Sequence, residues 1–302
     1  LARRPQSDDD LGAGPRGLAW ETGNEDIFVC CTAGGSVSVI SAFTLQVRKT
    51  LTAPLEQPID MALTPRQMNF GFARRVYFGY ILNTDGSVSI YESGPDGING
   101  RGYDDIVATL PFLFRRARTL QPDVTELDSA VFILHENPLG PDGIPTGQAG
   151  GAVTRFGIVD GDIGVVPLGT DASAPPHLRN LRFGIKSSLG EGPLGLSGVP
   201  IDLAFDDQMN LSALTNHSTV FSAGQPLPFN GKSLVRLFGP DIRPASAPAF
   251  LFLAVPGETP ESGRVDVIRL AAGERADTDP FQSGIQSIPL PNVSGLMNYF
   301  RQ

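Results

Sequence analysis

The sequence of 302 residues is poor in charge, in cysteine and in histidine. Charged residues make up 18% of the chain, and the formal net charge is −9. This balance argues against a general nucleic-acid-binding protein, because phosphate contacts need clustered lysine and arginine. It also argues against an anionic membrane surface as the main partner. No run of about 18 apolar residues occurs, so the sequence predicts no transmembrane helix.

The only two cysteines, Cys30 and Cys31, are neighbours in the chain. Adjacent residues of a strand point to opposite faces, so an ordinary disulfide between them is not expected. We expect two small apolar side chains, one of them in a core. A strained vicinal disulfide or a reactive thiol is the alternative.

The three histidines, His135, His177 and His217, do not have the spacing of metal ligands. No Cys-x-x-Cys, His-Glu-x-x-His or haem-attachment pattern is present. His135 ends an apolar strand-like run, where we expect a structural histidine with satisfied hydrogen bonds. We therefore assign no catalytic residue and no cofactor.

Turn-forming residues, in contrast, are abundant, with 35 glycines and 26 prolines. This composition favours many short strands joined by tight loops. One short phrase recurs, as PRGLAW at 15–20, PIDMAL at 58–63 and PIDLAF at 200–205. We interpret it as one strand of a repeating unit.

A predicted β-hairpin follows the phrase and occurs four times. In each hairpin an apolar run leads through a turn into a Gly-x-Val phrase with alternating side chains. The runs are 26–32 with 34–41, 76–82 with 85–92, 130–136 with 150–157, and 250–256 with 262–269. Return strands are predicted at 46–51, 105–111, 180–186 and 285–291.

Opening strand, hairpin and return strand predict an all-β fold, a β-propeller of four-stranded antiparallel blades. We expect residues 1–302 to form a single β-propeller domain or part of one. The predicted blades are about 13–53, 54–111, 112–190 and 198–291, with the first strand of a further blade at 292–302. Predicted insertions are 137–149, 157–179 and 206–247. Four blades and one extra strand favour a piece of a larger propeller over a compact ring closed by that strand.

Two segments of the chain resemble a known family. DIFVCCTAGGSVSVIS (26–41) and VYFGYILNTDGSVSIYE (76–92) each follow a P-x-[GD]-[LM]-A phrase and resemble YVTN-type repeats. The likeness is good over 13–110, weaker over 248–300 and poor over 112–190, and FVCCT and GYILN replace the Tyr-Val-Thr-Asn phrase. It implies a propeller with seven blades when complete, in the periplasm or extracellular at the cell surface, often as a surface or binding component.

Two acidic groups are weak candidates for a metal site. Asp60 and Asp202 hold the same place in their opening strands, where they could contribute to a cation site in the channel. The favoured alternative is an Asp that hydrogen-bonds the turn entering its strand. The second group is a loop with Asp96, Asn99, Asp104 and Asp105, a composition that calcium loops use, although an ordinary Asx-rich turn is favoured.

One basic cluster stands out in this acidic chain. Arg115, Arg116 and Arg118 follow each other closely and form a weak candidate contact for an acidic partner or anion. A blade edge protected by charge against edge-to-edge pairing is the favoured alternative.

The sequence favours a non-enzymatic propeller that acts as a protein-interaction or assembly module outside the cytoplasm. Its insertions would supply the surface for a protein partner, and the chain would belong to a larger assembly. One alternative is a lactonase-like hydrolase with a divalent cation in the channel, for which Asp60 and Asp202 need further acidic ligands. The other alternative is the partner of a cytochrome, for which the chain supplies no cofactor ligand.

Overall fold

The regular secondary structure of the described residues is almost entirely β-strand. The computed structural model describes residues 11–20, 26–52, 54–64, 67–68, 75–93, 104–110, 114–123, 129–139, 144–158, 166–167, 182–186, 194–205, 211–217, 220–222, 225–236, 250–270, 272–279 and 281–293. Within these residues no helix has the length and hydropathy needed to cross a membrane. The chain divides into two compact units near residue 195, and each unit is described by itself.

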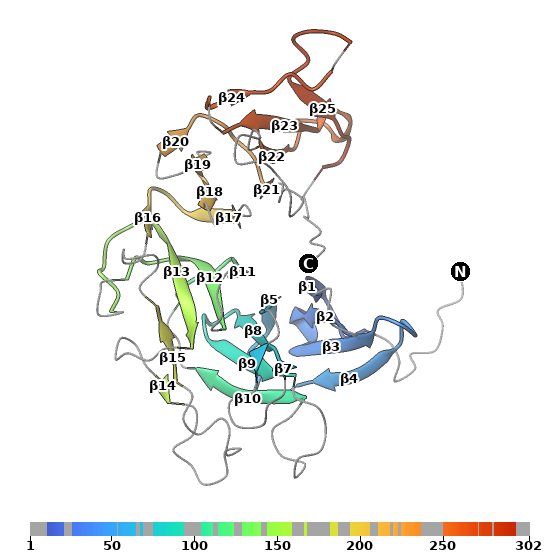
Figure 1. Cartoon of the computed structure of the whole chain (residues 1–302), viewed down its shortest axis with the longest axis vertical. Helices are drawn as coiled ribbons and strands as arrows, with labels where there is room; N and C mark the ends of the chain where they lie inside the picture. The colour runs from blue at the N-terminus through green and yellow to red at the C-terminus, as the bar shows by residue number, and fades with distance from the viewer. Residues whose placement is uncertain are drawn as a thin grey trace. The chain divides into compact units, whose positions relative to one another are not determined.

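Blade one opens unit one and is an antiparallel meander, drawn in blue in Figure 1. Its strands are β1 (Pro15–Trp20), β2 (Asp26–Cys31), β3 (Ser36–Ser41) and β4 (Val47–Leu51). The short 3-10 turn η1 (Thr32–Gly34) joins β2 to β3, and Gly35 after it has a φ of 61°, a conformation that favours glycine. The predicted opening strand, hairpin and return strand are thus confirmed.

Blade two repeats the meander with strand order β10-β9-β8-β5. The strands are β5 (Pro58–Leu63), β8 (Phe78–Asn83), β9 (Val88–Glu92) and β10 (Asp105–Leu110). A small hairpin of β6 (Gln67–Met68) and β7 (Arg75–Val76) lies between β5 and β8 in the chain. All residues of β8 and β9 are buried, including the polar side chains of Asn83, Ser89 and Glu92.

Blade three has its main strands in the order β11-β12-β13-β15-β14. They are β11 (Thr119–Pro122), β12 (Ala130–Glu136), β13 (Gly151–Ile158), β14 (Val166–Pro167) and β15 (Arg182–Ile185). The hairpin and the return strand at 180–186 were predicted, whereas the opening strand β11 was not. The short strand β16 (Leu194–Leu196) follows at the boundary between the units in the chain.

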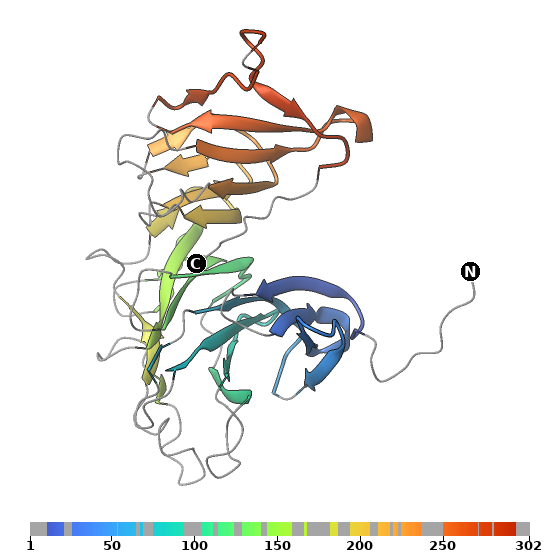
Figure 2. The same ribbon diagram turned by 45° about the vertical axis from the view of Figure 1, so that its right-hand side comes forward.

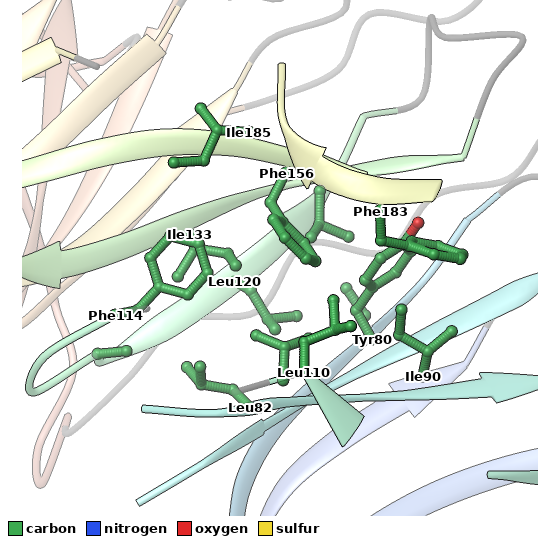
Figure 3. Packing of buried hydrophobic residues seen from close by; sticks show 14 of the residues in the cluster. Tyr80, Leu82, Ile90, Leu110, Phe114, Leu120, Ile133, Phe156, Phe183 and Ile185 are labelled. Carbon is green, nitrogen blue, oxygen red and sulfur yellow. The ribbon is translucent and has the colours of Figure 1, made fainter. Parts of the chain in front are cut away.

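An aromatic cluster fills the space between blades two and three (Figure 3). The rings of Tyr80 and Phe156 meet edge to face with centroids 6.1 Å apart, and Phe114 packs against Phe156 at 5.6 Å. Edge-to-face pairs of this kind add to the stabilisation from apolar burial. The Tyr80 hydroxyl lies 2.8 Å from Oγ of Ser129, so the buried phenol has a hydrogen-bond partner.

Unit two begins with blade four, in the order β17-β18-β19-β20. Its strands are β17 (Pro200–Phe205), β18 (Leu211–Thr215), β19 (Val220–Ser222) and β20 (Gln225–Leu227). Figure 2 shows these strands in yellow and orange.

Blade five has the order β21-β22-β23-β24, and β25 also pairs with β23. The strands are β21 (Ser233–Arg236), β22 (Phe250–Val255), β23 (Arg264–Arg269), β24 (Glu274–Arg275) and β25 (Ser287–Pro289). A single 3-10 turn, η2 (Pro260–Ser262), joins β22 to β23.

The predicted blade at 198–291 is wrong, because two sheets occupy this range. The predicted insertion 206–247 is also wrong, since it supplies the strands β18 to β20 of blade four and the opening strand of blade five. These strands have three to five residues, too few for side-chain alternation to be recognised in the sequence. The further strand predicted at 292–302 lies outside the described residues beyond Val293.

Candidate functional site

The opening strands of all five blades share one position, which we call the junction position. It is occupied by Gly17, Asp60, Thr119, Asp202 and Ser233. In β1, β5 and β17 a shift in register follows the proline and brings this residue opposite Cys30, Leu82 and Leu214 of the next strand. The recurrent hexapeptide therefore places Gly17, Asp60 and Asp202 at equivalent points of blades one, two and four.

Asp60 joins blade two to blade three. Its Oδ2 accepts hydrogen bonds from the Thr119 hydroxyl at 2.6 Å and the Leu120 amide at 3.2 Å, both on β11. Its Oδ1 accepts the amide of Met61, the next residue of its own strand, at 2.9 Å. Both carboxylate oxygens are therefore engaged by donors of the opening strands.

Asp202 repeats this geometry between blades four and five. Oδ2 accepts the Ser233 hydroxyl at 2.8 Å and the Leu234 amide at 3.0 Å, and Oδ1 accepts the Leu203 amide at 2.9 Å. Burial raises the pKa of the Asp202 carboxyl, and the hydrogen bonds from Ser233 and the two amides oppose this effect. Desolvation of the carboxylate outweighs the three hydrogen bonds, so the pKa stays above its usual value.

Gly17 holds the junction position of blade one without a side chain. A Cβ atom there would lie 2.7 Å from Cα of Asp60 and 2.7 Å from the carbonyl oxygen of Ile59. These are backbone atoms, which cannot move aside without displacing β5. Glycine therefore permits the close approach of β1 to β5.

The aspartates at the junction positions act as blade junctions. Each accepts hydrogen bonds from its own strand and from the opening strand of the following blade, whereas the sequence favours a hydrogen bond to the turn entering the strand. These three hydrogen bonds occupy most of the acceptor sites of each carboxylate. Within the described residues, no group of three or more His, Cys, Asp or Glu side chains could hold a metal ion.

The loop candidate for calcium is only partly visible, because Asp96 and Asn99 lie outside the described residues. Asp104 accepts hydrogen bonds from Arg48 at 2.6 and 3.0 Å and from the Tyr91 hydroxyl at 2.6 Å. Arg48 also binds Asp26 at 2.7 Å. The exposed Asp105 accepts its neighbour's amide at 2.9 Å and lies 3.8 Å from Lys49. Asp104 thus ties blade two to the return strand of blade one through Arg48.

The contribution of the Asp104 carboxylate to the stability of the fold is expected to decrease at low pH. Burial alone would raise its pKa, but the hydrogen bonds from Arg48 and Tyr91 outweigh it and lower the pKa below the usual range. A lowered carboxyl pKa stabilises the fold above the unfolded value of about 4, and this contribution is lost as the pH falls through the folded pKa. We expect Asp104→Asn to lower the melting temperature at pH 6 and to change it much less at pH 3. An equal decrease at both pH values would contradict this.

The arginine cluster lies on blade three, next to the loop between β12 and β13. Arg115 and the half-exposed Arg116 and Arg118 are at the surface, and the last two bind Glu136 at 3.2 and 3.4 Å. Ile144, on the loop that starts after Glu136, is 62% exposed. Sequence analysis placed these residues at a blade edge or a partner surface, and the structure leaves their cationic groups accessible.

His135 and the cysteines are buried in the described core. The His135 ring nitrogens lie 2.8 Å from the carbonyl oxygen of Glu136 and 2.8 Å from Oγ1 of Thr154, as expected for a structural histidine. His177 lies outside the described residues.

Cys30 and Cys31 are fully buried free thiols, and burial raises the pKa of Cys30. The expectation of two small apolar side chains is confirmed.

The pKa of His135 makes the fold sensitive to mild acid. Burial lowers this pKa to about 4, whereas an unfolded histidine titrates near 6.5. The neutral ring therefore stabilises the fold above pH 6.5, and this contribution decreases as the pH falls towards 4. It amounts to a loss of about 2 kcal/mol between pH 7 and pH 5. We expect urea unfolding of His135→Gln to depend less on pH over this range than that of the wild type. Parallel pH dependences would contradict this.

Sequence reasoning missed the partners of the candidate carboxylates. The hydroxyl groups of Thr119 and Ser233 donate hydrogen bonds to Asp60 and Asp202. Each of these two donors is followed by a leucine, Leu120 or Leu234. A hydroxyl residue before a leucine in an opening strand is the signal that could have located them. The buried pair of Asp123 and Arg155, 2.7 Å apart, has no comparable signal.

Comparison with known proteins gives the fold of the chain. No protein-family model matches it, and no curated protein sequence does. It is similar to the WD40 domain of coronin from Toxoplasma gondii, with a TM-score of 0.52 and 10% identity, over 94% of this chain and 63% of that one. A gluconolactonase from Xanthomonas campestris has a TM-score of 0.44, 13% identity and coverages of 94% and 77%.

Hydrazine synthase from Kuenenia stuttgartiensis has a TM-score of 0.47, 13% identity and coverages of 96% and 68%. The chain thus spans less than two thirds of the coronin chain's length. Identities this low bear on the fold alone. The antiparallel meanders and the similarity to the coronin domain show that the chain is built as a β-propeller.

Proposed function

We propose that this propeller is a non-enzymatic protein-interaction or assembly module that works outside the cytoplasm. The observation that carries the proposal is the set of hydrogen bonds that the junction carboxylates accept from the following blade. Asp60 and Asp202 hold neighbouring blades together through both of their oxygens, so they serve the scaffold. A lactonase-like cation site would need these same oxygens.

The surface that we assign to the partner lies on blade three. It combines Arg116 and Arg118 with the exposed Ile144 on the loop after Glu136. Arginine is enriched in protein interfaces and at their hot spots. Glu136 orients the two guanidinium groups, which could still bind carboxylates of an acidic partner. We propose the compartment on the basis of the resemblance to surface and periplasmic propellers.

Charge reversal on this surface tests the proposal. The immobilised chain is used to capture partner protein from extracts of its host. We expect the double variant Arg116→Glu/Arg118→Glu to retain at least about tenfold less partner protein than the wild type. The matched control is Arg269→Glu, an exposed arginine on β23 in unit two. Equal retention by the charge-reversed variant and the wild type would contradict this surface. Metal-dependent hydrolysis of lactones or esters by the wild type would contradict the non-enzymatic role.

A further inference from the structure

The connection between blades four and five contains an Asn-Gly pair, Asn230 and Gly231. It joins β20 to β21, the opening strand whose Ser233 hydroxyl binds Asp202. The pair lies outside regular secondary structure, Asn230 is exposed, and all of these residues belong to unit two. Glycine has no Cβ atom, so its nitrogen reaches the side-chain amide of a preceding asparagine with little steric hindrance.

Packing explains why a glycine follows Asn230. A Cβ atom at Gly231 would lie 2.6 Å from Cγ of Leu253 and 2.7 Å from the carbonyl oxygen of Ala254, both on β22. This carbonyl oxygen also accepts the Lys232 amide at 2.9 Å, so the pairing of β21 with β22 holds it in place. The fold therefore requires glycine here and retains the reactive pair.

The Gly231 nitrogen is available for a reaction. Among the residues that the structure describes, none accepts a hydrogen bond from this amide. The Asp85-Gly86 turn shows the opposite case, because the Gly86 amide donates to the carbonyl oxygen of Asn83 at 3.0 Å. An amide that is already bonded must give up this bond before its nitrogen reacts, and the Gly231 amide has no such cost.

We propose that Asn230 is a modification site at which the chain deamidates spontaneously to isoaspartate, and that this product loosens the junction between blades four and five. The Gly231 nitrogen loses its proton and bonds to the side-chain carbonyl carbon of Asn230, and the side-chain nitrogen takes up a proton and leaves as ammonia. Water then breaks one C–N bond of the resulting succinimide. Opening at the main-chain carbonyl gives isoaspartate, and opening at the other carbonyl gives aspartate. The site is independent of the partner surface on blade three.

Isoaspartate adds one carbon atom to the main chain of a connection that is held at both ends. On one side Phe229 packs in a cluster with Leu253. On the other side the Ser233 hydroxyl binds Asp202 at 2.8 Å. The added atom therefore has to displace Gly231 from β22 or shift β21 away from Asp202. The aspartate product keeps the length of the main chain and adds only a negative charge.

Ageing of the full chain tests the modification. Wild type and Asn230→Gln are incubated at pH 6 and pH 8, and their peptides are mapped by mass spectrometry with electron-transfer fragmentation, which distinguishes isoaspartate from aspartate. Glutamine would form a larger ring and reacts much more slowly, while both chains keep the other Asn-Gly pair, Asn99-Gly100. We expect the wild-type Asn230 peptide to gain the mass difference between an amide and an acid, at least about fivefold faster at pH 8, because only the deprotonated nitrogen attacks.

Urea unfolding of the aged chains tests the effect on the junction. We expect the isoaspartate-containing fraction of the wild type to unfold at a lower urea concentration than aged Asn230→Gln. Any change at Asn99 is common to both chains and cancels in this comparison. Asn230→Asp carries the charge without the added atom and should unfold close to the fresh wild type.

Three results would count against the proposal. An Asn230 peptide that keeps its mass at pH 8 overturns the modification site, whether or not the Asn99 peptide changes. Identical unfolding of aged wild type and aged Asn230→Gln overturns the effect on the junction. An equally low midpoint for Asn230→Asp would assign the loss to charge and contradict the role of the lengthened main chain.

Discussion

Replacing Asp202 by alanine is expected to lower the free energy of unfolding of unit two by about 3 kcal/mol, since leaving buried donors unsatisfied costs about 1–3 kcal/mol each. The carboxylate accepts the Ser233 hydroxyl and the amides of Leu203 and Leu234, and alanine leaves all three without this acceptor. The contact also connects blades four and five, so both sheets lose part of their mutual support. Urea unfolding monitored by circular dichroism measures the change.

A double-mutant cycle separates this contact from general damage. We expect Ser233→Ala alone to cost less than Asp202→Ala, and the double variant to cost less than the sum of the two. Asp105→Ala is the control, because this carboxylate is exposed and accepts only its neighbour's amide and a distant lysine. Strict additivity of Asp202→Ala and Ser233→Ala would show that the two side chains are not coupled.

Adding a single methyl group at Gly17 is expected to destabilise unit one by about 1–3 kcal/mol, the usual range for overpacking. The new Cβ would lie 2.7 Å from backbone atoms of Ile59 and Asp60, so truncating a neighbouring side chain cannot relieve the clash. Blade one would have to move away from blade two. The expected result is a lower denaturation midpoint for Gly17→Ala.

The neighbouring residue provides the control for this substitution. Arg16→Ala alters the same strand at an exposed position, and we expect it to change stability by less than about 0.5 kcal/mol. If Gly17→Ala unfolded at the same denaturant concentration as the wild type, β1 would not approach β5 as closely as described.

The repeated elements could be predicted because their chemistry is visible along the chain. The hairpin of β8 and β9 combines apolar runs with the Asp85-Gly86 turn, where Gly86 has a φ of 90° and the Ser87 amide binds Asp85 at 2.8 Å. Such runs and turn residues indicate a hairpin without any knowledge of the tertiary structure. The opening strands β1, β5 and β17 were found through their common phrase.

The parts that were missed lack such local signals. Strand β11 has the sequence TLQP, only four residues ending in a proline. Strands β19 and β20 have three residues each, so the long apolar hairpin at 250–269 was assigned to the wrong opening strand. Short strands depend on pairing with their neighbours rather than on their own pattern.

The role of the candidate carboxylates also required the fold. The sequence placed Asp60 and Asp202 at equivalent points, but their acceptor geometry depends on Thr119 and Ser233, which lie 59 and 31 residues further along the chain. The sequence placed Asp104 in a candidate calcium loop or an Asx-rich turn, whereas in the structure it binds Arg48, which lies 56 residues away. Sequence spacing identified the residues, and tertiary pairing decides what they bind.

Thermal unfolding with and without divalent cations tests the junction role of the carboxylates most directly. The wild type and Asp60→Asn/Asp202→Asn would be melted in excess EDTA and in millimolar calcium, manganese or zinc. We expect the variant to melt several degrees below the wild type by the same amount in every condition, because its loss is of hydrogen bonds between blades. A wild type stabilised by one of these cations, together with a variant that has lost only this stabilisation, would contradict the account and favour a cation site at the junction aspartates.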